Sequence, residues 1–167
     1  IEYLVASRYL TEARAFGIPG DRAADGEFLL GKSLIESGQF DEGLEILDAL
    51  LLEKSFAANP IIPKAQRLRA ETCLSMPNPK LDKALSYNLI LLSNPGLTEA
   101  ERAHDALRRT ECLARLERFD EARQTLDTVP VDERTSAGVA LMRGKIDLDE
   151  INAALERVAP ADRDDIL

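Results

Sequence analysis

Residues 26–33 match a pattern that binds nucleotide phosphates, G-x-x-x-x-G-K-[ST]. That loop works because its backbone N–H groups point at phosphate from the turn between a buried strand and a helix. Here the stretch reads GEFLLGKS, which is apolar and helix-forming, and no hydrophobic strand precedes it. We therefore expect these residues to belong to a helix, and we expect no nucleotide cofactor.

Side chains that could form a catalytic or metal site are few. The chain has one histidine, His104, and two cysteines, Cys73 and Cys112, which lie 39 residues apart. Histidine catalysis needs an oriented partner and usually a nucleophile, and zinc needs several Cys or His ligands. His104 lies in the charged helical stretch AERAHDALRR, and each cysteine is expected to be a small buried apolar residue without a disulfide. The sequence thus predicts no enzyme, no metal site and no cofactor.

Carboxylates are abundant, and their positions indicate a structural role. Asp41, Asp82, Asp120 and Asp149 each stand at the start of an apolar-periodic run. An aspartate there accepts hydrogen bonds from unpaired helix N–H groups and favours the positive end of the helix dipole. Paired carboxylates perform glycosidase chemistry only when a cleft raises one pKa. We therefore interpret these residues as helix starts.

Composition favours closely packed helices. Apolar residues make up 45% of the 167-residue chain, aromatic residues only 5%, and tryptophan is absent. Ala, Leu, Glu and Arg dominate, and no long alternation of β-branched residues predicts a strand. The net charge of −9, without a cluster of Lys and Arg, argues against binding to nucleic acid or to an anionic membrane.

The ends and the compartment are less well defined by the sequence. No run approaches the ~20 apolar residues of a membrane span. The chain begins at Ile1 rather than Met, and residues 160–167 resemble the start of a further helix, so we expect a piece of a longer protein. The compartment stays open, with the cytoplasm slightly favoured over an extracytoplasmic location.

A short pattern recurs along the chain. SGQFDEGLEIL at 37–47, NPKLDKALSYN at 78–88 and LERFDEARQTL at 116–126 each hold a large apolar residue, an Asp and then a small residue. The large apolar residues are 41 and 38 positions apart, and a weaker copy, KIDLDEINAAL at 145–155, follows after 29. Each copy predicts a second helix that begins after a turn, which makes one helical hairpin per repeat.

The first helix of each hairpin precedes its turn, and prolines separate the hairpins. Thr98 and Glu101 form a capping-box pattern at the start of one such helix. The predicted repeats are 24–57, 63–94, 98–129 and, more weakly, 132–158. Residues 1–17 are expected to form the lone helix of a truncated unit.

This pattern resembles the tetratricopeptide repeat, a helical hairpin of about 34 residues with a glycine-plus-aromatic corner and small residues in both helices. The resemblance is clearest in the first repeat, at Leu30, Gly31, Leu34, Gly38, Phe40, Gly43 and Leu47. The third repeat matches at Leu113, Phe119, Ala122 and Leu126.

Several positions depart from that family's pattern. Glu27 stands where the family has tryptophan, Leu50 and Thr110 replace small residues, and prolines bound the corner of the second repeat. The spacings of 41 and 38 also exceed the consensus length. The units are therefore interpreted as divergent tetratricopeptide-like repeats.

The resemblance implies an all-α fold, a right-handed superhelical solenoid whose concave side is lined by the first helices. It implies a non-catalytic scaffold that binds a peptide or helix of a protein partner in that groove. Lys32 and Arg69 could clamp a peptide carboxylate. The residues expected on the concave face are Phe28, Lys32, Ile35, Arg69, Met76, Leu107, Arg108 and Glu111.

Two alternatives stay open at this point. The chain could be a structural or regulatory module of a larger enzyme or membrane-anchored protein whose activity lies elsewhere. It could also self-associate through its terminal helices, because the ends of a helical array expose apolar faces when nothing caps them. The predicted helix at 2–16 carries Tyr3, Leu4, Leu10 and Phe16, which favours this second alternative.

Overall fold

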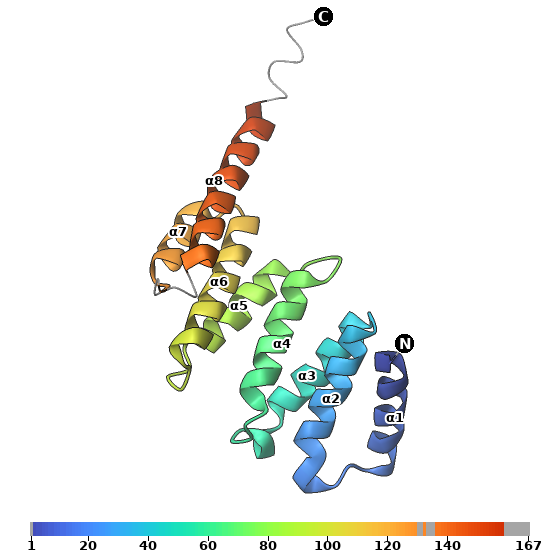
Figure 1. The fold of residues 1–167 in the computed structure, drawn as a ribbon. Helices are drawn as coiled ribbons and strands as arrows, with labels where there is room; N and C mark the ends of the chain where they lie inside the picture. The colour runs from blue at the N-terminus through green and yellow to red at the C-terminus, as the bar shows by residue number, and fades with distance from the viewer. Residues whose placement is uncertain (1, 130–131, 133–135, 159–167) are drawn as a thin grey trace, which may run out of the picture. The chain divides into compact units, whose positions relative to one another are not determined.

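The computed structural model describes residues 2–129, 132 and 136–158. Within these ranges the secondary structure is entirely helical, which confirms the predicted all-α class (Figure 1). The chain forms two compact units, residues 1–87 and 88–167, and the boundary lies inside α5. The α-helices are α1 (Glu2–Phe16), α2 (Ala23–Glu36), α3 (Phe40–Leu52), α4 (Ile62–Ser75), α5 (Leu81–Leu92), α6 (Glu99–Arg115), α7 (Phe119–Asp127) and α8 (Ser136–Val158). Two single 3-10 turns, η1 (Gly20–Arg22) and η2 (Lys54–Phe56), follow α1 and α3.

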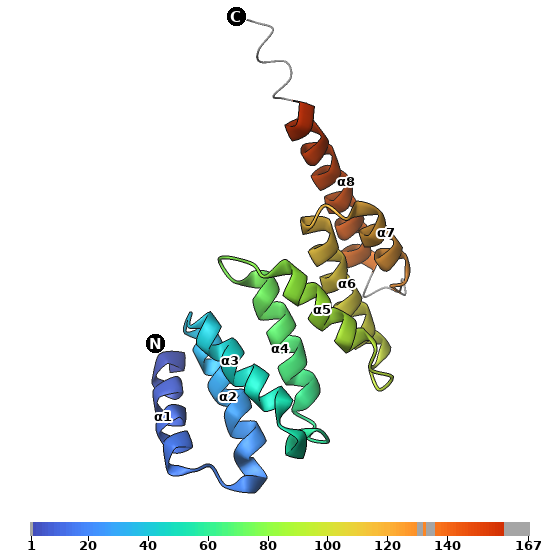
Figure 2. The same cartoon turned by 180° about the vertical axis from the view of Figure 1, so that it is seen from behind.

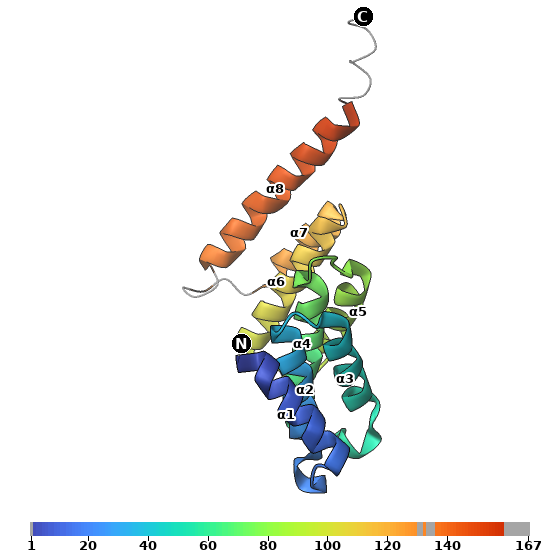
Figure 3. The ribbon, with the colours of Figure 1, turned by 90° about the vertical axis from the view of Figure 1, so that its right-hand side faces the viewer.

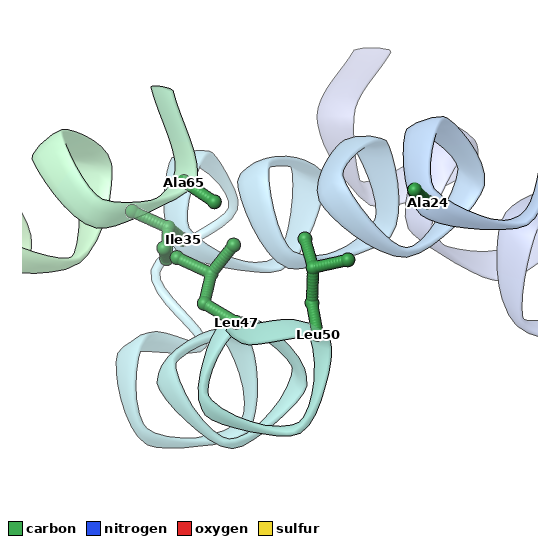
Figure 4. Packing of buried hydrophobic residues seen from close by; sticks show 5 residues of the cluster. All are labelled: Ala24, Ile35, Leu47, Leu50 and Ala65. Atoms are coloured by element: carbon green, nitrogen blue, oxygen red, sulfur yellow. The ribbon is translucent and has the colours of Figure 1, made fainter. Parts of the chain in front are cut away.

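In the first unit each helix packs on its neighbour along the chain. α1 lies on α2, α2 on α3 and α3 on α4 (Figures 1 and 2). A small apolar core joins α2, α3 and α4, and Figure 4 shows Leu47 and Leu50 of α3 projecting toward α2, with Ala24 farther along. The core residues are Ala24, Ile35, Leu47, Leu50 and Ala65. Half-buried side chains such as Phe28 and Phe40 extend this core toward the surface.

Two glycines let α2 and α3 approach closely. A Cβ placed on Gly43 would lie 2.6 Å from Cγ1 of Ile35 and 2.8 Å from the carbonyl oxygen of Gly31. A Cβ placed on Gly31 would lie 3.0 Å from Cδ2 of Leu47. The backbones of the two helices therefore touch at a point where any side chain would hold them apart.

The corner between α2 and α3 recurs between α6 and α7. Gly38 has φ +88°, and its N–H donates to the carbonyl oxygen of Ile35 at 2.9 Å. The N–H of Gln39 donates to the carbonyl oxygen of Leu34, also at 2.9 Å. Glu117 has φ 57° and repeats both bonds: its N–H donates to Ala114 at 3.0 Å, and the N–H of Arg118 donates to Leu113 at 2.9 Å. Both corners are left-handed helix caps with the same hydrogen-bond pattern.

The corner between α4 and α5 is built differently. It is two residues longer than the others, because α4 ends at Ser75 and α5 begins at Leu81. Met76 is extended, and the N–H of Lys80 donates to the carbonyl of Cys73 at 2.8 Å. The prolines at 77 and 79 cannot donate backbone N–H groups, which explains why the shorter cap is not formed here.

In the second unit α6 and α7 form a hairpin, and α8 packs on both. Thr98 and Glu101 form the predicted capping box at the start of α6. Arg123 of α7 pairs with Asp147 of α8 at 3.0 Å and with Glu150. Lys145 lies 3.7 Å from Glu111 of α6.

The hairpin predicted in residues 132–158 is wrong. Residues 136–158 form one continuous helix, which Figure 3 shows as a single rod, so that Gly144 and Asp149 lie inside it. A lone glycine costs a helix only about 1 kcal/mol, and no proline or second turn residue reinforces Gly144. The helix predicted at 160–167 lies outside the described residues.

Candidate partner-binding surface

α2 presents one stripe of side chains to solvent. Asp25, Leu29, Lys32 and Glu36 are exposed or half-exposed, and their spacing of four, three and four residues places them on one face of the helix. Leu30, Gly31 and Ser33, which lie between them, are buried. Leu29 is 49% exposed, so this stripe combines an apolar contact with charges of both signs.

α6 presents the equivalent stripe in the second unit. His104, Arg108, Glu111 and Arg115 lie 79 positions after their counterparts in α2, and they have the same spacing from the following corner. Nη1 of Arg108 donates to Glu111 at 2.8 Å, and Nδ1 of His104 lies 3.3 Å from the buried carboxylate of Asp105. This stripe is therefore mainly basic, with its charges held by local pairs.

The predicted contact residues of the second repeat, Arg69 and Met76, lie elsewhere. Met76 is buried. Nη1 of Arg69 donates to Asp48 of α3 at 2.7 Å, and its guanidinium carbon lies 3.7 Å from the centre of the Tyr87 ring. Arg69 thus joins α3, α4 and α5 within the first unit.

The length of the corner explains the error at Met76. α4 ends at Ser75, so Met76 lies in the corner and not on the helix. In α4, Lys64 and Ser75 are exposed, and the half-buried side chains include Arg67, Arg69 and Glu71. Arg69 is turned inward by its contacts with Asp48 and Tyr87.

Three of the other predicted residues also pack inward. Ile35 is buried against Gly43, and Phe28 is half-buried against the core. Leu107 is half-buried, and a Cβ placed on Gly138 would lie 3.7 Å from its Cδ1, so it faces α8. Lys32, Arg108 and Glu111 are the predicted residues that lie on the exposed stripes.

A cleft of about 200 Å³ in the first unit was not predicted. Acidic residues of α3 line one wall, and Lys80, Lys83 and Tyr87 line the other. Lys80 donates a hydrogen bond to Asp41, which raises the pKa of Lys80. The sequence alone indicates that the acidic side chains of the cleft share one helix face, because Asp41, Glu45 and Asp48 are spaced by four and three residues. It does not indicate that α3 lies beside the start of α5.

Cys73 also borders this cleft, but it is poorly suited to act as a nucleophile. Its side chain is buried, and this burial raises its pKa, so that the unreactive thiol prevails near neutral pH. Burial likewise raises the pKa of Cys112 to about 11. Both cysteines are free and buried, as predicted.

Searches for other kinds of site give no candidate in the described part of the chain. There, no three or more His, Cys, Asp or Glu side chains gather in a way that could hold a metal ion. No described helix has the length and apolar character needed to cross a membrane. Comparison with family models, curated proteins and solved structures gives no match to this chain.

Proposed function

We propose that this chain is a non-catalytic protein-interaction module of the tetratricopeptide-like class. In this proposal the hairpins stack as a right-handed superhelical solenoid and hold a peptide or helix of a partner protein along the exposed faces of their first helices. The observation that carries the proposal is the equivalence of α2–α3 and α6–α7. The two hairpins share the same corner hydrogen bonds, 79 positions apart.

Two equivalent buried positions of α3 and α7 keep the same character in the two hairpins. Leu47 and Leu126 are buried, and so are the small residues Gly43 and Ala122. Such positions are set by packing, because each hairpin must bury its apolar face against its neighbours. The equivalence therefore supports a repeat architecture rather than two unrelated helix pairs.

Equivalent exposed positions differ in charge. Lys32 of α2 corresponds to Glu111 of α6, and Glu36 corresponds to Arg115. Glu36 and Arg115 are exposed, so packing does not determine them, and the two stripes offer different chemistry on the same scaffold. That arrangement suits recognition of successive parts of an extended partner, with charge pairs that select the partner rather than supply most of the affinity.

The experiment is an affinity capture from the source organism with the 167-residue chain as bait, beside two variants. Lys32→Glu/Arg108→Glu changes one exposed charge on each stripe. Arg8→Glu/Lys54→Glu makes the same change in net charge at exposed positions of α1 and η2, away from both stripes. We expect a partner that the native bait and the control retain and that the stripe variant loses.

A direct titration with the captured partner then gives the size of the effect. We expect Lys32→Glu/Arg108→Glu to raise Kd by about tenfold or more, with unchanged circular dichroism. Equal loss in the control variant would show that binding follows net charge alone. Full retention by the stripe variant would place the contact on another surface.

A further inference from the structure

α8 has two apolar faces, and only one of them is covered by the described residues. Val139 and Ile146 are buried in the second unit, where α8 packs on α6 and α7. On the opposite face, Leu141 is 77% exposed, Leu148 57%, Ile151 57% and Leu155 62%. Four large apolar side chains on one helix face form a patch of the kind that marks an interaction site.

The spacing of this patch indicates the shape of what covers it. Leu141, Leu148 and Leu155 are seven residues apart, and Gly144 and Ile151 lie three residues after Leu141 and Leu148. A repeat of seven with apolar residues at the first and fourth positions keeps a straight seam along a helix and fits the seam of a second helix. An extended peptide has a period of two and would not follow it.

We infer that this patch pairs α8 with α8 of a second copy of the chain, in antiparallel orientation and centred between Asp149 and Glu150. In this register Leu148 lies opposite Ile151 of the second copy, and Leu155 lies opposite Gly144. The space for Leu155 exists, because no atom lies within 4 Å of a Cβ placed on Gly144. A parallel pair would set glycine against glycine and leave a gap at that layer.

Charge selects the same register. Lys145 and Glu156 lie on the same edge of the patch, because they are eleven residues, or three helical turns, apart. Antiparallel pairing brings Lys145 of each copy beside Glu156 of the other. A shift by one heptad would instead place Lys145 beside Lys145 and Asp147 beside Asp147. The contact of Lys145 with Glu111 in its own chain is loose, at 3.7 Å, and leaves its amine able to reach across.

This pairing is separate from the proposed function. It uses α8, whereas the proposed partner contacts lie on α2 and α6, so either property can be lost while the other is kept. Its consequence for binding is that the two copies present two sets of stripes on one particle, which raises the apparent affinity for any partner with a repeated motif.

The first test is the mass of the 167-residue chain by sedimentation equilibrium at about 100 µM. We expect roughly twice the chain mass of 18.4 kDa, and we expect Leu148→Glu to raise the dimer Kd by about 30-fold or more. Two controls carry the same kind of change elsewhere: Leu52→Glu on α3 and Tyr9→Glu on α1, at side chains that are 80% and 69% exposed. Both controls should remain dimeric, and circular dichroism should be equal for all variants.

The second test addresses orientation. Lys145→Glu should weaken the dimer by about three- to tenfold, and Lys145→Glu/Glu156→Lys should restore it. Ala137→Cys should form no disulfide between copies, because antiparallel pairing separates the two cysteines by about 35–40 Å along the helix axis. The native cysteines are buried and do not interfere.

Each contrary result overturns the inference. A chain that is monomeric at about 100 µM has no such pair. A dimer that survives Leu148→Glu but dissociates with Tyr9→Glu is held by α1. A disulfide between Ala137→Cys copies, or a charge-reversed double variant that stays as weak as Lys145→Glu, rules out the antiparallel register.

Discussion

At the scale of single residues, the contact between α2 and α3 depends on the absence of a side chain at position 43. The carbonyl oxygen of Gly31 belongs to the backbone of the facing helix, so it cannot move aside as a flexible side chain would. The same substitution has opposite consequences at glycines that differ only in surroundings. Gly43 lies against a neighbouring helix, whereas Gly144 faces open space on the outside of α8.

We therefore predict opposite effects of Gly43→Ala and Gly144→Ala on the free energy of unfolding. Gly43→Ala should lower it by about 1–3 kcal/mol, because the helices must separate to admit the methyl group. Gly144→Ala should raise it by about 0.5–1 kcal/mol at protein concentrations below the dimer Kd, because alanine is the better helix former and no atom of the same chain meets its methyl group. Urea unfolding followed by circular dichroism measures both, and a stable Gly43→Ala variant would mean that α2 and α3 do not touch there.

The buried thiol of Cys112 gives stability a dependence on alkaline pH. Burial raises its pKa from 9.0 to about 11, so the folded state holds this proton more tightly than the unfolded chain does. Its contribution is fully present below pH 9 and is lost as pH rises through 11. We predict that Cys112 accounts for about 2–3 kcal/mol of the stability lost over that range.

The measurement compares urea midpoints of the native chain and of Cys112→Ala at pH 8 and at pH 11. Burial also raises the pKa of Cys73 and of Tyr87, so the variant will keep part of the alkaline loss. The difference between the two proteins in how far the urea midpoint falls from pH 8 to pH 11 isolates the contribution of Cys112. An equal fall in both proteins would show that this thiol is accessible to solvent in the folded protein.

At the scale of elements, the corners decide what could be read from the sequence. Phe40 and Phe119 each follow a three-residue corner, and before these corners Lys32, Arg108 and Glu111 lie on the half-exposed stripes. The corner at 76–80 has five residues and a different cap, so Met76 falls in the corner and not on α4. Ile35 is buried because α3 packs closely against α2. The spacing of residues along α2 alone does not predict how close the two helices come.

The error in residues 132–158 has another origin. Gly144 was interpreted as a corner because it precedes a weak copy of the repeat pattern. A corner needs residues that stop the first helix as well as one that permits the turn, and here both flanks are good helix formers. The all-α class and the hairpins at 24–57 and 98–129 depended on strong, mutually consistent signals, and the structure has a helix pair in each range.

The two equivalent corners offer a test of their shared geometry. Glu117 adopts the left-handed conformation that Gly38 adopts in the first hairpin, with φ 57°, and a side chain there is strained. We predict that Glu117→Gly raises the free energy of unfolding by about 0.5–1 kcal/mol, even though it removes an exposed ion pair with Arg157. Gly38→Ala should lower it by about 1 kcal/mol. A Glu117→Gly variant that is less stable than the native chain would show that its ion pair outweighs the strain.

At the scale of the whole molecule, stability should be local to each unit. The chain forms two compact units, and in each of them helices pack on their neighbours along the chain. In such an array the free energy is close to a sum of hairpin terms and nearest-neighbour interface terms, so a defect in one hairpin is felt mostly by that hairpin and the next. A single globular core would instead spread the same defect over every helix.

Native-state hydrogen exchange of Gly43→Ala distinguishes these two cases. We predict that the slowest amides of α2 and α3 lose about 1–3 kcal/mol of protection, because the substitution separates those helices. The amides of α6 and α7, in the other unit, should change by less than about 0.5 kcal/mol. Thr110→Ala, a buried substitution in α6, serves as the reciprocal control and should reverse the pattern. An equal loss of protection in both units for either variant would mean that the chain unfolds as one cooperative body, and the repeat architecture proposed here would then lose its energetic basis.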